Sequence, residues 1–236
     1  DVTTGERKIL IGGFAGDTLT TGADNVAIGY NAIGGVTTGN YNIAIGREAG
    51  GVLTSGNSQV LIGHNAGKAL TTGEKNVAIG YEALKTEDEH GRNVAVGFMA
   101  LNAQNAGSNA YNTAVGYNAG AAITTGIANT LVGGLSGDAL TDGQYNVTLG
   151  YHTLSNSVSS SSNTAIGYNA MGDGVTTGDS NVAVGSNAGK NLTSGGFNVL
   201  IGRNAGDALT TGGGNIAIGY LALTTEDAHG RNIAIG

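Results

Sequence analysis

The sequence predicts an all-β chain folded as a parallel β-solenoid, a β-roll of about 14 coils with a 17-residue repeat. The main observation is a glycine that ends a short apolar cluster fourteen times, with 11 of the 13 intervals between these marker glycines being 17 residues long. The 44 glycines disfavour helices, and the β-branched residues of the clusters favour strands. The marker glycines are Gly12, Gly29, Gly46, Gly63, Gly80, Gly97, Gly116, Gly133, Gly150, Gly167, Gly185, Gly202, Gly219 and Gly236.

Each repeat divides into one expected strand and two expected turns. The working consensus is N-V-A-I-G-Y-N-A-G-x-x-L-T-T-G-x-x, in which V-A-I is the strand. The N-A-G and T-T-G segments are the turns, joined by a weaker stretch. Coils of this kind stack strand on parallel strand about 4.8 Å apart.

Residues 1–236 form one repeat array, within which a larger module recurs. Residues 28–97 are repeated as residues 166–236, and even the variant segments align. Irregular repeats lie within 80–116 and 150–185, where one interval is 19 residues and another is 18. We expect the chain to be a segment of a longer array.

The residues of each expected strand are apolar on both faces. Side chains alternate along a strand, so Val77 and Ile79 share one face and Ala78 takes the other. We expect the Val/Ile face to fill the coil and the middle residue to contact neighbouring chains, because a strand that is apolar on both faces is buried on both. This interpretation predicts a homotrimer wound around its own axis, with inter-chain contacts at Ala27, Ala44, Leu61, Ala78, Ala95, Leu131 and Leu200.

An asparagine stands four residues before the marker glycine in 12 of the 14 repeats. Asparagine side chains bond well to turn backbone, so we expect a structural ladder that links one coil to the next. The predicted ladder consists of Asn25, Asn42, Asn76, Asn93, Asn112, Asn129, Asn146, Asn163, Asn181, Asn198, Asn215 and Asn232.

Polar and aromatic residues give few signs of a site. The segments 87–92 and 226–231 both contain Glu-Asp-x-His-Gly-Arg. These residue types could form a metal site or an acid/base pair, but we interpret both segments as solvated corners that replace the usual Thr-Thr-Gly turn. We therefore predict no catalytic residue, no metal site, no cofactor and no enzymatic activity. An aromatic column that follows the marker glycines is a possible binding surface, although such columns more often pack against themselves: Tyr30, Tyr81, Tyr117, Tyr151, Tyr168 and Tyr220.

Charge and hydropathy limit the partners. The net charge is −7 and the 10 basic residues are thinly spread, which disfavours nucleic acid. No run approaches the roughly 18 apolar residues of a membrane span, so we expect no membrane insertion. The chain contains no cysteine, which removes disulfides and thiolate ligands.

The repeated "NVAIGYNA" with "TTG" between copies resembles the repeat region of bacteriophage tail fibres and the head repeats of trimeric autotransporter adhesins. The resemblance covers the whole chain, although the adhesin head repeat is shorter and has an Ala-rich second strand. It implies parallel β-rolls that trimerise into fibres and carry a receptor-binding part.

On this resemblance we expect an extracellular structural shaft segment, on a virion or cell surface, that serves adhesion or receptor attachment. A host glycan or protein would bind through parts outside the segment. The alternative from the residues is a monomeric ice-binding β-solenoid with regular Thr columns. Against it, the adjacent Thr71 and Thr72 would point to opposite faces.

Overall fold

The computed structural model describes residues 6–35 and 37–236. In these residues there are 14 strands of three residues each, all in parallel pairings, and no helix. The described part of the chain therefore has no helix that could cross a lipid bilayer. The predicted all-β parallel solenoid with its 17-residue spacing is confirmed.

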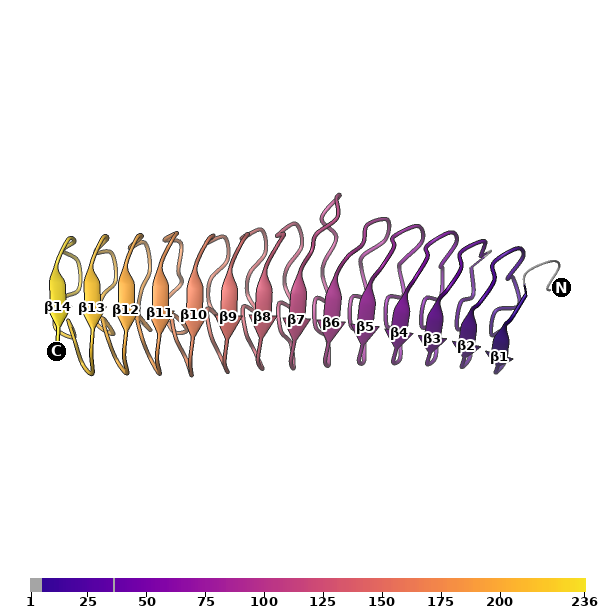
Figure 1. Cartoon of the computed structure of the whole chain (residues 1–236), viewed down its shortest axis with the longest axis horizontal. Coiled ribbons are helices and arrows are strands. Elements are labelled where there is room, and N and C mark those ends of the chain that lie inside the picture. Colours follow the sequence, from indigo (N-terminus) through magenta and orange to yellow (C-terminus); the bar gives the residue numbers. More distant parts are fainter. Residues whose placement is uncertain (1–5, 36) are drawn as a thin grey trace. The chain divides into compact units, whose positions relative to one another are not determined.

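The chain divides into two compact units, 1–115 and 116–236. Within each unit the strands lie side by side in chain order, one strand to a coil (Figure 1). The first unit contains β1 (Ile9–Ile11), β2 (Val26–Ile28), β3 (Ile43–Ile45), β4 (Val60–Ile62), β5 (Val77–Ile79), β6 (Val94–Val96) and β7 (Thr113–Val115). The second unit contains β8 (Thr130–Val132), β9 (Val147–Leu149), β10 (Thr164–Ile166), β11 (Val182–Val184), β12 (Val199–Ile201), β13 (Ile216–Ile218) and β14 (Ile233–Ile235).

Neighbouring strands pair without any shift, so equivalent residues of successive repeats are stacked. In the β4–β5 pair, Val60, Leu61 and Ile62 lie opposite Val77, Ala78 and Ile79. The same register holds across the 18-residue interval, where Ala165 of β10 lies opposite Ala183 of β11. Each column of the solenoid is thus made of one position of the repeat.

The two faces of the strands are the reverse of the expected arrangement. The middle residues point into the coil, and Ala27, Ala44, Leu61, Ala78, Ala95, Leu131 and Leu200 all have 0% exposure. The flanking Val and Ile residues face outward and are half-buried or exposed. The prediction that the middle column contacts other chains was wrong, because a side chain with no exposed surface cannot meet a second chain.

The physical reason is that each coil is thin: its inner face holds Ala or Leu, and in β9 Thr148, but no Val or Ile. Leu61 reaches across the coil, so that a Cβ built on Gly50 would lie 2.9 Å from its Cδ1 and one on Gly67 would lie 2.7 Å from its Cδ2. Alanine fits at the same place in most other repeats. The small middle residue therefore marks the inside of the coil.

Each coil has room for one large aliphatic side chain opposite the strand, and two positions compete for it. Gly67, four residues after its marker glycine, is followed by the buried Leu70; a Cβ on Gly67 would lie 2.7 Å from Cδ1 of Leu70. In the next coil the equivalent positions hold Leu84 and Glu87, and Leu84 is fully buried. Leu84 takes the place of the missing leucine, at a left-handed φ of 50°.

The exchange follows a rule that the whole sequence obeys. Wherever the residue four places after the marker glycine is Gly, the residue seven places after it is Leu or Ile. Wherever the former (the earlier position) is Ile, Leu or Met, the latter (the later position) is another residue type. The earlier aliphatics are Ile33, Leu84, Leu101, Leu154, Met171 and Leu223. A left-handed conformation costs a bulky residue about 1–2 kcal/mol, so the buried volume of the side chain must offset that cost.

The asparagine column forms hydrogen bonds between coils. Asn42 donates its N–H to Oδ1 of Asn25 (2.9 Å), and its Nδ2 donates to the carbonyl of Gly56 (2.9 Å). Gln59 takes the same place in its coil, accepting from the N–H of Asn76 (3.1 Å). The structure thus shows the expected ladder, in which each amide joins two coils.

The irregular 19-residue interval lies between β6 and β7. The surplus residues form a loop that projects from the coil (Figure 1). Gly107 lies in this loop with a φ of 66°, and a Cβ on it would meet no atom within 4 Å. The insertion is accommodated outside the coil, and β6 and β7 keep their register.

Candidate functional site

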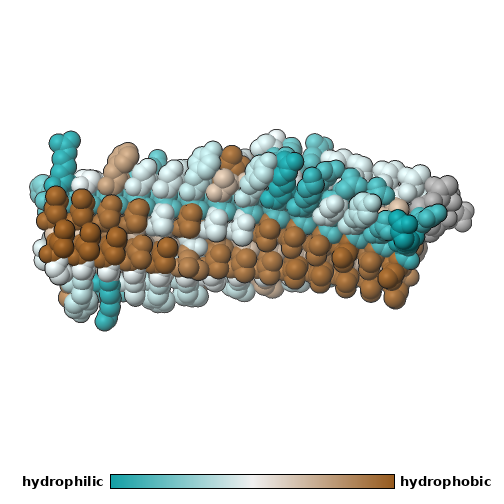
Figure 2. Space-filling model, viewed as in Figure 1, coloured by the Kyte–Doolittle hydropathy of each residue, from teal (hydrophilic) through white to brown (hydrophobic). Residues whose placement is uncertain are grey.

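The outward face of the sheet carries exposed and half-buried apolar side chains along each unit. It consists of the first and third residues of every strand, such as Val77 and Ile79 of β5, and we call it the outward Val/Ile face. Figure 2 shows these residues as apolar columns over the strands. Exposed apolar patches of more than a few hundred Å² mark sites of interaction, so this face is the candidate functional site.

Several residues of the outward Val/Ile face are well exposed. Ile11 is 58% exposed, Leu149 50% and Val147 42%. Thr113, Thr130 and Thr164 replace the apolar residue at the first place of β7, β8 and β10, so the face is not uniformly apolar. We did not predict this surface from the sequence, because we expected the bulky residues of each strand inside the coil. The small size of the middle residues was the signal for the opposite arrangement.

Eleven of the twelve asparagines of the ladder are buried, and Asn232 in the last coil is half-buried. Asn25, Asn42 and Asn76 are all 0% exposed, and their side chains bond to backbone of the adjacent coils. Such side chains hold coils together and are not accessible to a ligand. Their role is structural, as the sequence suggested.

The hydroxyls of the Thr-Thr-Gly turns are also used between coils. Thr54 donates to the carbonyl of Thr71 (3.0 Å), and Thr71 donates in turn to the carbonyl of Asp88 (3.0 Å). In the second unit Thr193 donates to the carbonyl of Thr210 (3.0 Å). These hydroxyls form a second ladder along the turns.

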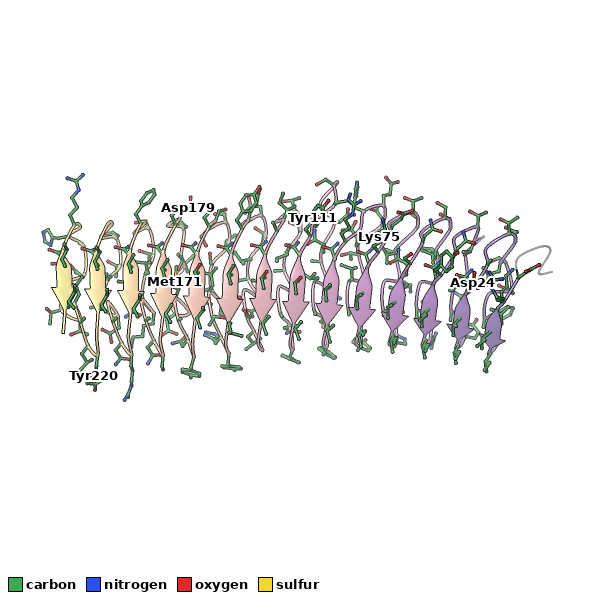
Figure 3. All side chains as sticks on the ribbon, in the orientation of Figure 1. Asp24, Lys75, Tyr111, Met171, Asp179 and Tyr220 are labelled. Atoms are coloured by element: carbon green, nitrogen blue, oxygen red, sulfur yellow. The ribbon has the colours of Figure 1, made fainter. Side chains whose placement is uncertain are left out.

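The aromatic column packs along its own coils. The rings of Tyr81 and Phe98 stack with centroids 5.1 Å apart, and His64 stacks on the other side of Tyr81 at 5.3 Å. Tyr151 and Tyr168 stack at 6.0 Å, and Figure 3 shows Tyr220 at the opposite edge of the second unit from Asp179. All six tyrosines of the column are nevertheless 44–63% exposed, so ligand binding through the column stays a prediction.

The polar segment 87–92 is not the solvated corner that was expected. Glu87 has 0% exposure because it occupies the position at which the preceding coil buries Leu70. Its Oε1 accepts the N–H of His90 (3.2 Å), and burial raises the pKa of Glu87 above its usual value. Arg92 lies apart and donates to the hydroxyl of Tyr111 (2.9 Å).

The second copy of the segment has a different environment. Oε1 of Glu226 accepts from the N–H of His229 (2.8 Å) and contacts its Nδ1 (2.9 Å). Hydrogen bonds from the His229 backbone and side chain lower the pKa of Glu226. The side chain of His229 is 84% exposed, so this copy does resemble the expected solvated corner.

A shallow groove of about 610 Å³ crosses the turns of the second unit. Gly196, Gly213 and Gly214 form its floor, and Phe197 and Arg231 stand beside them. Gly196 and Gly213 occupy the same turn position in consecutive repeats. In most other repeats this position has a side chain, so the two glycines leave a hollow. The Gly-Gly pairs at 195–196 and 213–214 were the signal in the sequence.

Comparison of the chain with protein-family models, with curated proteins and with solved structures gives no match. The likeness to tail-fibre and adhesin repeats therefore stays a prediction from the sequence. The fold and the outward Val/Ile face are the observations on which a function can be argued.

Proposed function

We propose that this chain is a structural shaft segment of a homotrimeric fibre on a virion or cell surface, where it serves adhesion or receptor attachment. The observation that carries the proposal is the outward Val/Ile face, which recurs on every strand of both units. The receptor, a host glycan or protein, binds parts of the fibre outside this segment. The shaft segment itself is extracellular.

The argument for association is that parallel sheets are buried on both faces in almost all proteins. In each unit the Ala/Leu column covers the inner face, and the outward Val/Ile face is left without cover. Burying apolar surface stabilises by about 25 cal/mol per Å². Three chains that turn this face to a common axis would cover it in each unit.

The role of the segment is mechanical. Within each unit, the asparagine and threonine ladders add side-chain bonds between successive coils to the backbone pairings. These bonds run in one direction along successive coils and oppose their separation. A shaft needs this property, and it needs no reactive group.

The light-scattering molar mass of the chain on a size-exclusion column tests the proposal. We expect a mass near three times 23.2 kDa. A chain that elutes as a monomer at micromolar concentration would contradict the association and with it the fibre.

The second candidate is a monomeric ice-binding solenoid, favoured by the regular spacing of the outward columns and by Thr113, Thr130 and Thr164 within them. The turn threonines do not add to it, because Thr54 and Thr71 direct their hydroxyls to backbone carbonyls. A monomeric mass together with faceted ice crystals in the protein solution would support this function instead.

A further inference from the structure

The interior of the coil that follows β5 contains an acid. Glu87 is fully buried, and Leu84 fills the aliphatic space beside it. A buried carboxylate normally has a partner for each oxygen or a cation beside it. Glu87 meets this requirement at one oxygen only, since Oε1 accepts from the N–H of His90.

Two buried atoms at this place are unpartnered. Oε2 of Glu87 and Nδ1 of His90 have no hydrogen-bond partner, and neither is exposed to solvent. Nδ1 of His90 lies 3.7 Å from Oε1 of Glu87, too far for a hydrogen bond. An imidazole nitrogen and a carboxylate oxygen of two residues that contact each other are therefore both buried and unpartnered.

Asp88 supplies a third group. One ligand atom from each of Glu87, Asp88 and His90 can be chosen such that all three lie within 4.8 Å of one another. Two ligands of a tetrahedral zinc ion are about 3.4 Å apart, given zinc–ligand bonds of about 2.0–2.2 Å. Small side-chain rotations would bring the three atoms to these separations.

In the second copy of the segment the corresponding side chains bond to each other. Nδ1 of His229 is 2.9 Å from Oε1 of Glu226, which is a direct hydrogen bond. The side chain of Glu226 is 23% exposed. The same residue types thus satisfy each other in one copy and leave two buried atoms unpartnered in the other.

We propose that Glu87, Asp88 and His90 form a binding site for one divalent zinc-class cation. Imidazole nitrogen with two carboxylates suits Zn²⁺, whereas Ca²⁺ prefers an all-oxygen site of higher coordination number. The half-buried Asp88 and His90 leave a fourth position for water. The cation would join the coil interior to the turn that replaces Thr-Thr-Gly.

The site is independent of the proposed fibre, because all three ligands belong to one coil of one chain. Tag-free protein freed of metal with EDTA would be titrated with ZnCl₂ by isothermal calorimetry. We expect one Zn²⁺ per chain, and an affinity at least tenfold lower for both Glu87→Gln and His90→Ala. The matched substitution in the second copy, Glu226→Gln, should leave the affinity unchanged.

Folding of each variant is checked by far-UV circular dichroism, and His90→Ala, at a partly exposed position, keeps the test valid if Glu87→Gln fails to fold. A Tm that rises with ZnCl₂ in the parent protein and not in His90→Ala would support the site. The absence of saturable Zn²⁺ binding, or binding that His90→Ala leaves unchanged, would overturn it. Equal affinity for CaCl₂ would overturn the assignment to zinc.

Discussion

Single buried amides hold the coils together, as Asn42 illustrates. Its Oδ1 accepts the N–H of Gln59 (3.0 Å), while its Nδ2 donates to the carbonyl of Gly56 (2.9 Å). Both partners belong to the following coil. No water reaches this position, since Asn42 is fully buried.

The substitution Asn42→Ala would remove both bonds and leave a buried donor and a buried acceptor unpartnered. We expect a loss of about 2–4 kcal/mol in the free energy of unfolding, since each such group costs about 1–3 kcal/mol. Urea denaturation followed by circular dichroism measures it. Ser55→Ala, at an exposed turn residue of the same unit, is the control and should change stability by less than about 0.5 kcal/mol. Equal midpoints for the two variants would show that the ladder contributes little.

At the scale of the coil, one large aliphatic side chain fills the interior, and it comes from either of two positions of the repeat. Leu84 and Glu87 occupy the places that hold Gly67 and Leu70 one coil earlier. The strand takes part in the same exchange: Leu61, Leu131 and Leu200 occur where the coils on both sides have glycine at the earlier position. Each large residue thus fills space that a glycine leaves.

The double substitution Leu84→Gly with Glu87→Leu would convert one type of coil into the other. Leu84→Gly alone should cost about 2–4 kcal/mol, because it leaves a cavity. In the presence of Glu87→Leu the same change should cost at least about 1.5 kcal/mol less, since the new leucine fills the space. A double-mutant cycle from urea midpoints gives this coupling. Additive effects would mean that the two positions do not share one space.

The repeat itself determined most of what could be predicted at this scale. Regular marker glycines and β-branched clusters were sufficient for the strands, their spacing and the stacking of the asparagines. The direction in which each strand residue points was predicted wrongly, because Val77 and Ile79 resemble core residues, whereas it is the small Ala78 that fits inside the coil. Only the distance across the coil, seen where Leu61 meets Gly50 and Gly67, decides it.

The burial of Glu87 was not predicted for a related reason. An acidic run such as 87–89 normally lies in solvent, and its first residue is buried here only because Leu84 displaced the usual leucine. Aligning the repeats at both positions would have shown the exchange. The unpartnered atoms of Glu87 and His90, in contrast, depend on side-chain geometry that no sequence pattern contains.

For the molecule as a whole, we predict that the outward Val/Ile face forms the contacts between chains. Its residues contribute little to the coil interior, so charges on it should leave each unit folded. The inward column behaves oppositely, since Ala78 is fully buried. Assembly and folding can thus be tested separately.

The double substitution Val77→Lys with Ile79→Lys places two charges on the outward face of β5. We expect the light-scattering mass to fall from near three chains towards one, because unpaired charges would have to enter an apolar interface. Thr72→Lys, at an exposed turn residue, is the matched control and should keep the parent mass. Circular dichroism verifies that the solenoid remains. A variant that keeps the parent mass would show that this face is not the interface.

Stacking in register also bears on how such a chain can change over generations. Within each unit, and as far as the described residues extend, a strand contacts only the one before it and the one after it. A gene duplication that adds whole coils therefore creates no new kind of contact, provided that the two aliphatic positions match at the junction. The recurrence of 28–97 as 166–236 is the trace that such an event would leave. Length can then be selected in steps of one coil.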